Sequence, residues 1–267
     1  MEIRRAALDA LCLSVPAAKV NAVHALYAAA MPDADLDASA HLNPVHHLPG
    51  RPERPRLVAP MRLARRSPAT PQGRAALLHA VAHIELNAID LALDAVWRFS
   101  DLPEAYYRDW LRVAAEEALH FSLLEAHLAT LGHAYGDFDA HDGLWAMVER
   151  TAGDVVARMA LVPRTLEARG LDASPGMQAK LAQAGDARAV EILAIILRDE
   201  IGHVAVGNHW YRWLCERDGL DPLAHDALLT ERYAGPRPKP PFNVEARRAA
   251  GFSEAELQAL HDRAASP

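Results

Sequence analysis

Residues 115–120 read AEEALH and residues 198–203 read RDEIGH, so a histidine twice follows a glutamate by three positions. On an α-helix, residues three apart share a face, which places Glu117 beside His120 and Glu200 beside His203. Aliphatic residues occupy the rest of both faces, so each pair is expected to point into a protein core. Because an uncompensated carboxylate is costly to bury, something positive is expected beside these pairs.

The spacing of two further glutamates strengthens this pattern. With sixteen glutamates and fourteen histidines, chance alone gives about one such pair. Glu85, however, lies 32 residues before Glu117, and turn signals around Asp101 fall sixteen residues from each. A helical hairpin that turns there brings the two carboxylates level. Glu167 lies 33 residues before Glu200, nearly the same offset.

The combined order is Glu, Glu-x-x-His, Glu, Glu-x-x-His, which gives four carboxylates and two imidazoles from four helices. Oxygen-rich ligation with one imidazole per metal suits two iron or manganese ions better than zinc or magnesium. We therefore expect two bound metal ions, with iron ahead of manganese. If the third helix has another register, Glu149 or Asp154 takes the place of Glu167. The expected ligands are Glu85, Glu117, His120, Glu167, Glu200 and His203.

The fold expectation follows from four long amphipathic segments. Apolar residues recur at three- and four-residue intervals over 74–99, 104–132, 142–169 and 186–217. Within the third segment, Pro163 is expected to introduce a kink and Gly170 to end the helix. Strand patterns are nearly absent. The sequence therefore predicts an all-α protein built on a four-helix bundle.

Segments of different composition flank this bundle, which is expected at 74–220. Residues 1–42 predict N-terminal helices, and residues 43–73 form an arm rich in proline and arginine. Residues 221–267 hold a second proline-rich arm and a short final helix over 254–265, with Ser253 and Glu256 as its capping box. Each proline removes a backbone donor and restricts its predecessor, so the arms cannot be regular helix.

Composition limits the class of protein. The 267 residues are 51% hydrophobic and 24% charged, the balance of a globular chain. A net charge of −7 argues against nucleic-acid binding over the whole surface. Two cysteines without C-x-x-C spacing, Cys12 and Cys215, predict no disulfide framework and a cytoplasmic location. No stretch reaches the roughly 18 apolar residues that span a bilayer, so no membrane partner is expected.

Other polar residues have alternative interpretations. His79 and His83 lie off the face of the ligand expected on the same helix, and they are predicted at the surface or behind the ligands. Asp199 is either a surface residue or the orienting partner of a ligand histidine. Tyr106 and Tyr107 lie about three turns before the first Glu-x-x-His pair, and their role stays open.

Two further questions concern arginines. In a bundle without metal, the buried acids would pair with Arg158, Arg164 or Arg198, and the histidines would only fill space. The arginines of 51–74 and 232–248 either brace the arms against carboxylates or form a basic rim for RNA.

Four helical motifs carry a resemblance to a known family. They are HIELNAIDLALDA (83–95), AAEEALHFSLLEAHL (114–128), RMALVPRTLEARGLD (158–172) and ILRDEIGHVAVGNHWY (196–211). The arm motifs PGRP (49–52), RPRLVAP (54–60) and PPFNVEARRAAGF (240–252) extend it over most of the chain. The sequence resembles the ferritin-like di-iron carboxylate superfamily, and more closely a bacterial family of uncharacterised ferritin-like proteins classed as a domain of unknown function. The tRNA-modifying hydroxylase of the same superfamily is a more distant likeness.

The resemblance implies a ferritin-like four-helix bundle with a di-metal centre, and it carries over to the same six ligand positions. With the residue pattern, it predicts an oxidoreductase or hydroxylase that activates dioxygen or peroxide on an unidentified small-molecule substrate. Alternative functions are a non-catalytic metal-handling protein and a tRNA-modifying hydroxylase. Because the arms would obstruct assembly of a hollow shell, a monomer or small homo-oligomer is expected.

Overall fold

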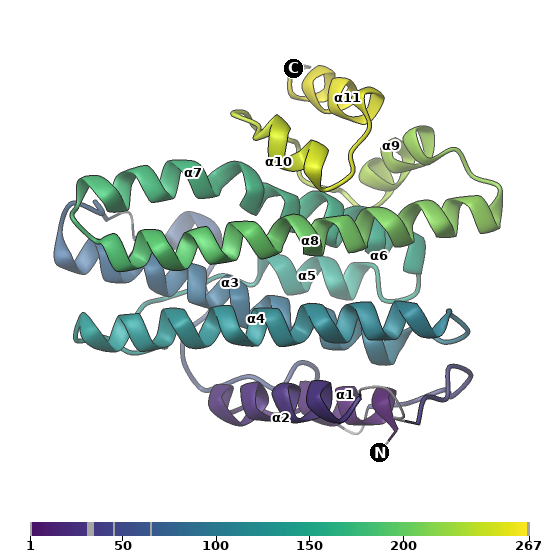
Figure 1. The fold of residues 1–267 in the computed structure, drawn as a ribbon, viewed down its shortest axis with the longest axis horizontal. Helices are drawn as coiled ribbons and strands as arrows, with labels where there is room; N and C mark the ends of the chain where they lie inside the picture. The colour runs from purple at the N-terminus through teal and green to yellow at the C-terminus, as the bar shows by residue number, and fades with distance from the viewer. Residues whose placement is uncertain (1, 31–34, 45, 65, 266–267) are drawn as a thin grey trace. The chain divides into compact units, whose positions relative to one another are not determined.

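The computed structural model describes residues 2–30, 35–44, 46–64 and 66–265. The regular elements of these residues are helices, which confirms the all-α class, and one isolated bridge pairs Leu57 with Ala140 (Figure 1).

The chain divides into two compact units. The first comprises Met1–Trp145 with Gln183–Ile192, and the second comprises Ala146–Ala182 with Leu193–Pro267.

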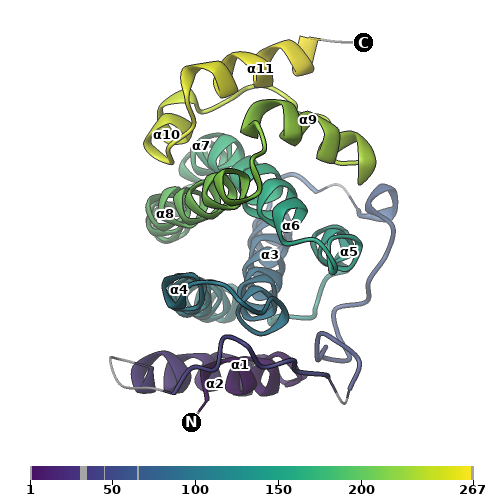
Figure 2. The ribbon, with the colours of Figure 1, turned by 90° about the vertical axis from the view of Figure 1, so that its right-hand side faces the viewer.

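A helical hairpin, α3 (Pro71–Arg98) and α4 (Glu104–Thr130), is the centre of the first unit. The N-terminal helices α1 (Ile3–Leu11) and α2 (Pro16–Ala29) pack against α3 and α4 respectively (Figure 2). The start of α3 is fixed by Thr70, whose side chain accepts a hydrogen bond from a backbone N–H of the first turn. Helices are therefore present in the N-terminal region as predicted, and Pro16 begins the second of them.

The turn of the hairpin lies where the sequence predicted it. Asp101 adopts a left-handed backbone with φ 60°, and its N–H donates to the carbonyl of Ala38 at 2.8 Å. The Tyr107 hydroxyl donates to the carbonyl of Phe99 at 2.9 Å and accepts from the N–H of Leu102 at 3.2 Å. Tyr107 therefore fastens the turn from inside the following helix, which gives this tyrosine a structural role.

Helix α3 is buried on almost every side. It is the one helix among the described residues that is long and apolar enough to cross a membrane, whereas the sequence was expected to hold no such segment. Its most apolar 18-residue window is 78% buried inside the protein. Packing against neighbouring helices therefore accounts for its apolar composition.

The described residues of the proline-rich arm before α3 are irregular, with bends and turns, one 3₁₀ turn, η1 (Pro60–Arg62), and the isolated bridge at Leu57. Its arginines bind carboxylates: Arg51 pairs with Asp142 at 2.7 Å and Arg56 pairs with Asp139 at 2.6 Å. These pairs support the bracing interpretation for this arm. Arg65, another of its arginines, lies outside the described residues.

The segment predicted as one kinked helix over 142–169 is divided in the structure. Helix α5 (Gly143–Arg150) ends in a turn, after which Asp154 caps α6 (Val155–Leu161) by accepting from Ala157 N at 2.9 Å. A π-helix, η2 (Val162–Glu167), follows directly. The predicted irregularity at Pro163 is thus present, and it takes the form of a widened helical turn.

The expectation that the helix ends at Gly170 is wrong. Helix α7 (Ala168–Gln183) continues through Gly170 and Pro175. Leu171 and Leu181 of this helix are fully buried. Their packing outweighs the weak helix propensity of the glycine.

Helix α8 (Ala187–Asp218) matches the predicted fourth segment, and it runs back beside α7. Helices α9 (Pro222–Arg232), α10 (Val244–Ala249) and α11 (Glu254–Ala265) complete the second unit.

The final helix has the predicted capping box. Ser253 N donates to the Glu256 carboxylate at 2.7 Å, and Glu256 N donates to the Ser253 hydroxyl at 3.3 Å. Helices α9 and α10 were not expected in a proline-rich arm. They begin at Asp221 and Asn243, whose side chains cap the first turns.

Candidate metal centre

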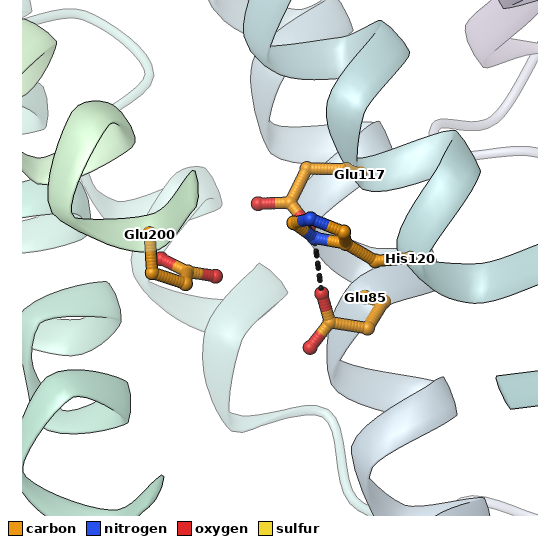
Figure 3. A group of neighbouring side chains, drawn as sticks. All are labelled: Glu85, Glu117, His120 and Glu200. Carbon is orange, nitrogen blue, oxygen red and sulfur yellow. Dashed lines mark hydrogen bonds and ion pairs between the residues drawn. The ribbon is translucent and has the colours of Figure 1, made fainter. Parts of the chain in front are cut away.

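Three of the expected ligands meet inside the α3–α4 hairpin. Glu85 of α3 is 2% exposed, and Glu117 and His120 of α4 are both 0% exposed. His120 Nδ1 lies 3.1 Å from Glu85 Oε2 and 3.2 Å from Glu117 Oε2. The three side chains point toward one another, each offering a ligand atom within 4.8 Å of the others (Figure 3). We call these residues the first triplet. Figure 3 also draws Glu200 of α8, which belongs to the second unit.

The geometry of the first triplet follows from the hairpin. Because α3 and α4 turn at Asp101, residues equally distant from the turn come level on the two helices. The His120 ring lies three residues beyond Glu117 on the same face, where it reaches the carboxylates of both helices. The prediction that the hairpin aligns Glu85 with Glu117 is therefore confirmed.

In the first triplet, two buried carboxylates lie close together, and this arrangement favours protonation of Glu85 and His120. Burial and the neighbouring charge of Glu117 raise the pKa of Glu85 to about 8. Burial by itself would lower the pKa of His120, but hydrogen bonds to Glu117 and Glu85 and the charges of both carboxylates raise it to about 12. The site thus retains at neutral pH protons that an ordinary glutamate and histidine would release.

The other three expected ligands belong to the second unit, and we call them the second triplet. Glu167, at the end of η2, is 9% exposed, while Glu200 and His203 of α8 are 7% and 0% exposed. His203 Nδ1 lies 3.9 Å from Glu200 Oε2. The Glu-x-x-His pair of α8 therefore shares a buried helix face, as its spacing predicted.

A close contact between the Gly207 backbone and the Pro163 ring sets the register of η2 against α8. A Cβ atom added at Gly207 would lie 2.4 Å from Cβ of Pro163, so only glycine allows this approach. The helices run in opposite directions (Figure 1), and Glu167 lies four residues after Pro163, while His203 lies four residues before Gly207. Glu167 and His203 are therefore brought to the same level within the second unit.

The alternatives to Glu167 are placed elsewhere. Glu149 is exposed near the end of α5. The Asp154 carboxylate caps α6 and accepts a hydrogen bond from the Tyr233 hydroxyl at 2.9 Å. Of the three acids considered for the third helix, Glu167 is the one that η2 places in the interior.

The arginines considered as partners for the buried acids each have contacts outside the two triplets. Arg158 donates to the carbonyl of Val148 at 2.7 Å and to the Thr151 hydroxyl at 2.8 Å. Arg164 binds Asp226 at 3.3 Å and Glu256 at 2.5 Å. Arg198 binds Asp199, the residue beside it in the chain, at 2.8 Å. The Asp199 side chain, which is 15% exposed, therefore has an arginine partner.

The structure excludes a surface position for His79 and His83. Both are buried, and burial lowers the pKa of each to about 4, so both rings are neutral. His79 Nε2 accepts from Gly136 N at 2.9 Å, and His83 Nδ1 accepts from the Tyr135 hydroxyl at 2.8 Å. The His83 Nε2–H donates to the carbonyl of His141 at 3.2 Å. These histidines fasten the segment after α4 to α3.

Sequence reasoning missed a buried ion pair in the first unit. Lys19 of α2 contacts the carboxylate of Asp90 in α3, and Lys19 also donates to the carbonyl of Gly50 at 3.0 Å. Burial raises the pKa of Asp90 to about 6 in spite of the lysine. A lysine in an otherwise apolar stretch of α2 was the one available signal.

Comparisons with known proteins identify one family described as of unknown function and one relative described as uncharacterized. An uncharacterised protein of Haemophilus influenzae (strain ATCC 51907 / DSM 11121 / KW20 / Rd) is 49% identical over 263 residues, which cover 95% of this chain and 91% of that protein. No solved structure matches the chain significantly. A family model matches residues 12–258. The chain belongs to the family described as "Protein of unknown function (DUF455)".

Proposed function

We propose that the protein is a di-metal carboxylate protein in which the first and second triplets jointly hold two metal ions, iron or manganese. In this proposal α3, α4, the α6–η2–α7 segment and α8 form a ferritin-like four-helix bundle. The observation that carries the proposal is the first triplet, in which two carboxylates and an imidazole lie buried and point toward one another.

The donor chemistry fits the proposed metal. Each triplet has the same content, one glutamate from one helix and a Glu-x-x-His pair from another. Carboxylate oxygens with one imidazole per ion suit divalent iron and manganese. A metal ion also supplies the positive charge that protons supply in the first triplet, so binding exchanges one for the other.

The proposed activity is oxidoreductase or hydroxylase chemistry with dioxygen or peroxide. Bound iron would supply the one-electron redox chemistry that such oxidants require. In the first triplet, Glu85 and Glu117 would neutralise the metal charge, and His120, released from its proton, would act as a nitrogen ligand. The low exposure of these side chains would exclude bulk water from the centre.

Elemental analysis of protein purified without chelator tests the metal site. We expect two equivalents of iron or manganese per chain, and their loss in Glu117→Ala and Glu200→Ala. The matched controls are Glu116→Ala, whose carboxylate pairs with Arg112, and Glu216→Ala on the exposed face of α8. Equal metal content in all four variants would contradict the proposal.

Oxygen chemistry needs a separate test. Metal-free protein is loaded with Fe(II) without oxygen and then exposed to air, and we expect oxygen uptake with a change in visible absorbance. Bound iron that neither changes absorbance nor consumes oxygen would favour the alternative of a metal-handling protein. Size measurement adds a second criterion, because a large hollow oligomer would indicate storage.

The tRNA-modifying alternative has no specific observation in its favour. Arg51 and Arg56 of the first arm are bound to carboxylates, and so is Arg248 of the second, which pairs with Glu254 at 2.6 Å.

A further inference from the structure

The second unit contains a hollow whose lining does not include the residues of the second triplet. About 690 Å³ of space, the open solvent at its mouth included, lies between its walls. Its walls come from η2, α7, α9, α10, α11 and the proline-rich segment 235–243. All of its lining residues belong to the second unit.

Cations outnumber acids in this hollow. The lining contains six cationic residues: Arg164, Arg169, Arg237, Lys239, Arg247 and Arg263. It contains three acids: Asp172, Asp226 and Glu256. The lining of the hollow therefore has three more cationic than acidic residues, whereas the protein as a whole has a net charge of −7.

Arginines already neutralise the three acids. Asp172 accepts two hydrogen bonds from Arg247, at 3.0 and 2.6 Å. Asp226 accepts from Arg263 at 2.7 Å, and Glu256 accepts from Arg164 at 2.5 Å. The acids therefore act as a rigid support that orients guanidinium groups, and they do not cancel the remaining cations.

Several donors stay available to a ligand. Arg263 Nε is buried and has no hydrogen-bond partner among the described residues. Arg169 of α7 and Lys239 of the proline-rich segment are exposed, and neither forms an ion pair within the described part of the chain. These three cations come from three different elements that line the space.

Apolar groups form the other part of the lining. Phe242, Phe252 and Leu260 line the hollow. The guanidinium carbon of Arg247 lies 5.4 Å from the centre of the Phe252 ring and 5.7 Å from that of Phe242. Such stacking holds both the cation and the aromatic ring in place before a ligand arrives.

We propose that this hollow binds an organic phosphate of two or three negative charges whose apolar or aromatic part lies on Phe242 and Phe252. A tetrahedral anion presents oxygens in all directions, which suits cations that converge from several elements better than a planar carboxylate does. The positive charges of Arg169 and Lys239 would pair with such an anion, and the phenylalanines give its remaining part an apolar contact. The site is independent of metal, and its binding is therefore measured on metal-free protein.

Titration calorimetry with pyrophosphate and with ADP tests the inference. Pyrophosphate probes the charge alone, and ADP adds a ring. We expect both to bind, with ADP at least tenfold tighter. The double substitution Arg169→Ser/Lys239→Ser removes exposed side chains and leaves the buried ion pairs intact, so it should weaken both ligands at least tenfold. Arg217→Ser, which removes an exposed arginine of α8 elsewhere in the unit, should leave both affinities unchanged.

A second substitution separates the two parts of the ligand. Phe242→Ala should reduce the affinity for ADP toward that for pyrophosphate and leave pyrophosphate binding unaltered, with circular dichroism as the check on folding. The proposal is overturned if neither probe binds at millimolar concentration in low salt, or if the Arg169/Lys239 variant binds as the parent does. It is also overturned if single-stranded RNA binds through the same two cations and ADP does not compete.

Discussion

Gly207 of α8 lies against Pro163 of η2 so closely that a Cβ atom on residue 207 would come within 2.4 Å of the proline Cβ. The proline lacks the N–H of a regular helix and sits where the chain widens into a π-turn. The glycine provides the space that the proline ring occupies. Glu167 ends that π-turn, so this contact determines where its carboxylate lies relative to the Glu-x-x-His pair of α8.

Substitution of this glycine should therefore disturb the second triplet. Gly207→Ala should lower the free energy of unfolding by about 1–3 kcal/mol, because overpacking outweighs the gain in helix propensity. It should also lower metal content. Gly202→Ala is the matched control in the same helix, since an added Cβ there meets nothing within 4 Å. Urea titration and elemental analysis of both variants check this. Equal behaviour of the two would show that the contact does not position Glu167.

Metal binding should release protons from the first triplet. Its metal-free form retains protons because the pKa of Glu85 is raised to about 8 and that of His120 to about 12. Apparent affinity for Mn(II) should therefore rise between pH 6 and pH 8, by up to about tenfold per pH unit for each proton displaced. Calorimetry in buffers of different ionisation enthalpy measures the number released. Glu85→Gln should release fewer, and a pH-independent affinity would argue against ligation by this triplet.

The stability of the metal-free protein should fall as pH rises from 6.5 to 8. Glu85 and His120 both have folded pKa values above their ordinary values, so the folded state holds more protons than the unfolded state over this window. The stability they contribute is present at the lower pH and is lost on raising it, by about 1.4 kcal/mol per pH unit for each proton retained. Glu85→Gln should flatten the dependence in urea titrations. A profile that rises with pH would be the contrary result.

The buried pair of Lys19 and Asp90 allows a double-substitution test. Lys19→Met leaves a buried carboxylate without its partner and should cost about 3–5 kcal/mol of stability. Lys19→Met/Asp90→Leu should recover most of that loss, because no charge then stays buried. Arg188→Met, which removes a surface partner of Glu191, should change stability by less than about 1 kcal/mol. If the double variant is no more stable than the single, the cost does not come from the stranded charge.

The local features of the centre could be predicted from the sequence. The i,i+3 spacing put Glu117 with His120 and Glu200 with His203, and apolar neighbours on the same faces predicted burial. The hairpin was predictable because Glu85 and Glu117 are equally distant from a turn that only a few residue types form. These relationships depend on helix geometry and chain reversal, which are properties of short stretches.

Other features depended on packing between distant segments. The sequence placed His79 and His83 either at the surface or behind the ligands, because they lie off the ligand face. In the structure they bond to Tyr135, Gly136 and His141, which makes the surface alternative wrong. Nothing near His79 in the sequence indicates that residues more than fifty positions later will bond to it.

The sequence by itself determined the all-helical class, the capping box of the final helix and the pairing of each Glu-x-x-His motif, because each follows from contacts within a few turns of one helix. Tertiary structure decided how far α7 extends, how η2 widens at Pro163 and which acid of the third segment turns inward. Those outcomes depend on which side chains a neighbouring helix can accommodate. The space that Gly207 of α8 leaves for the Pro163 ring is an example.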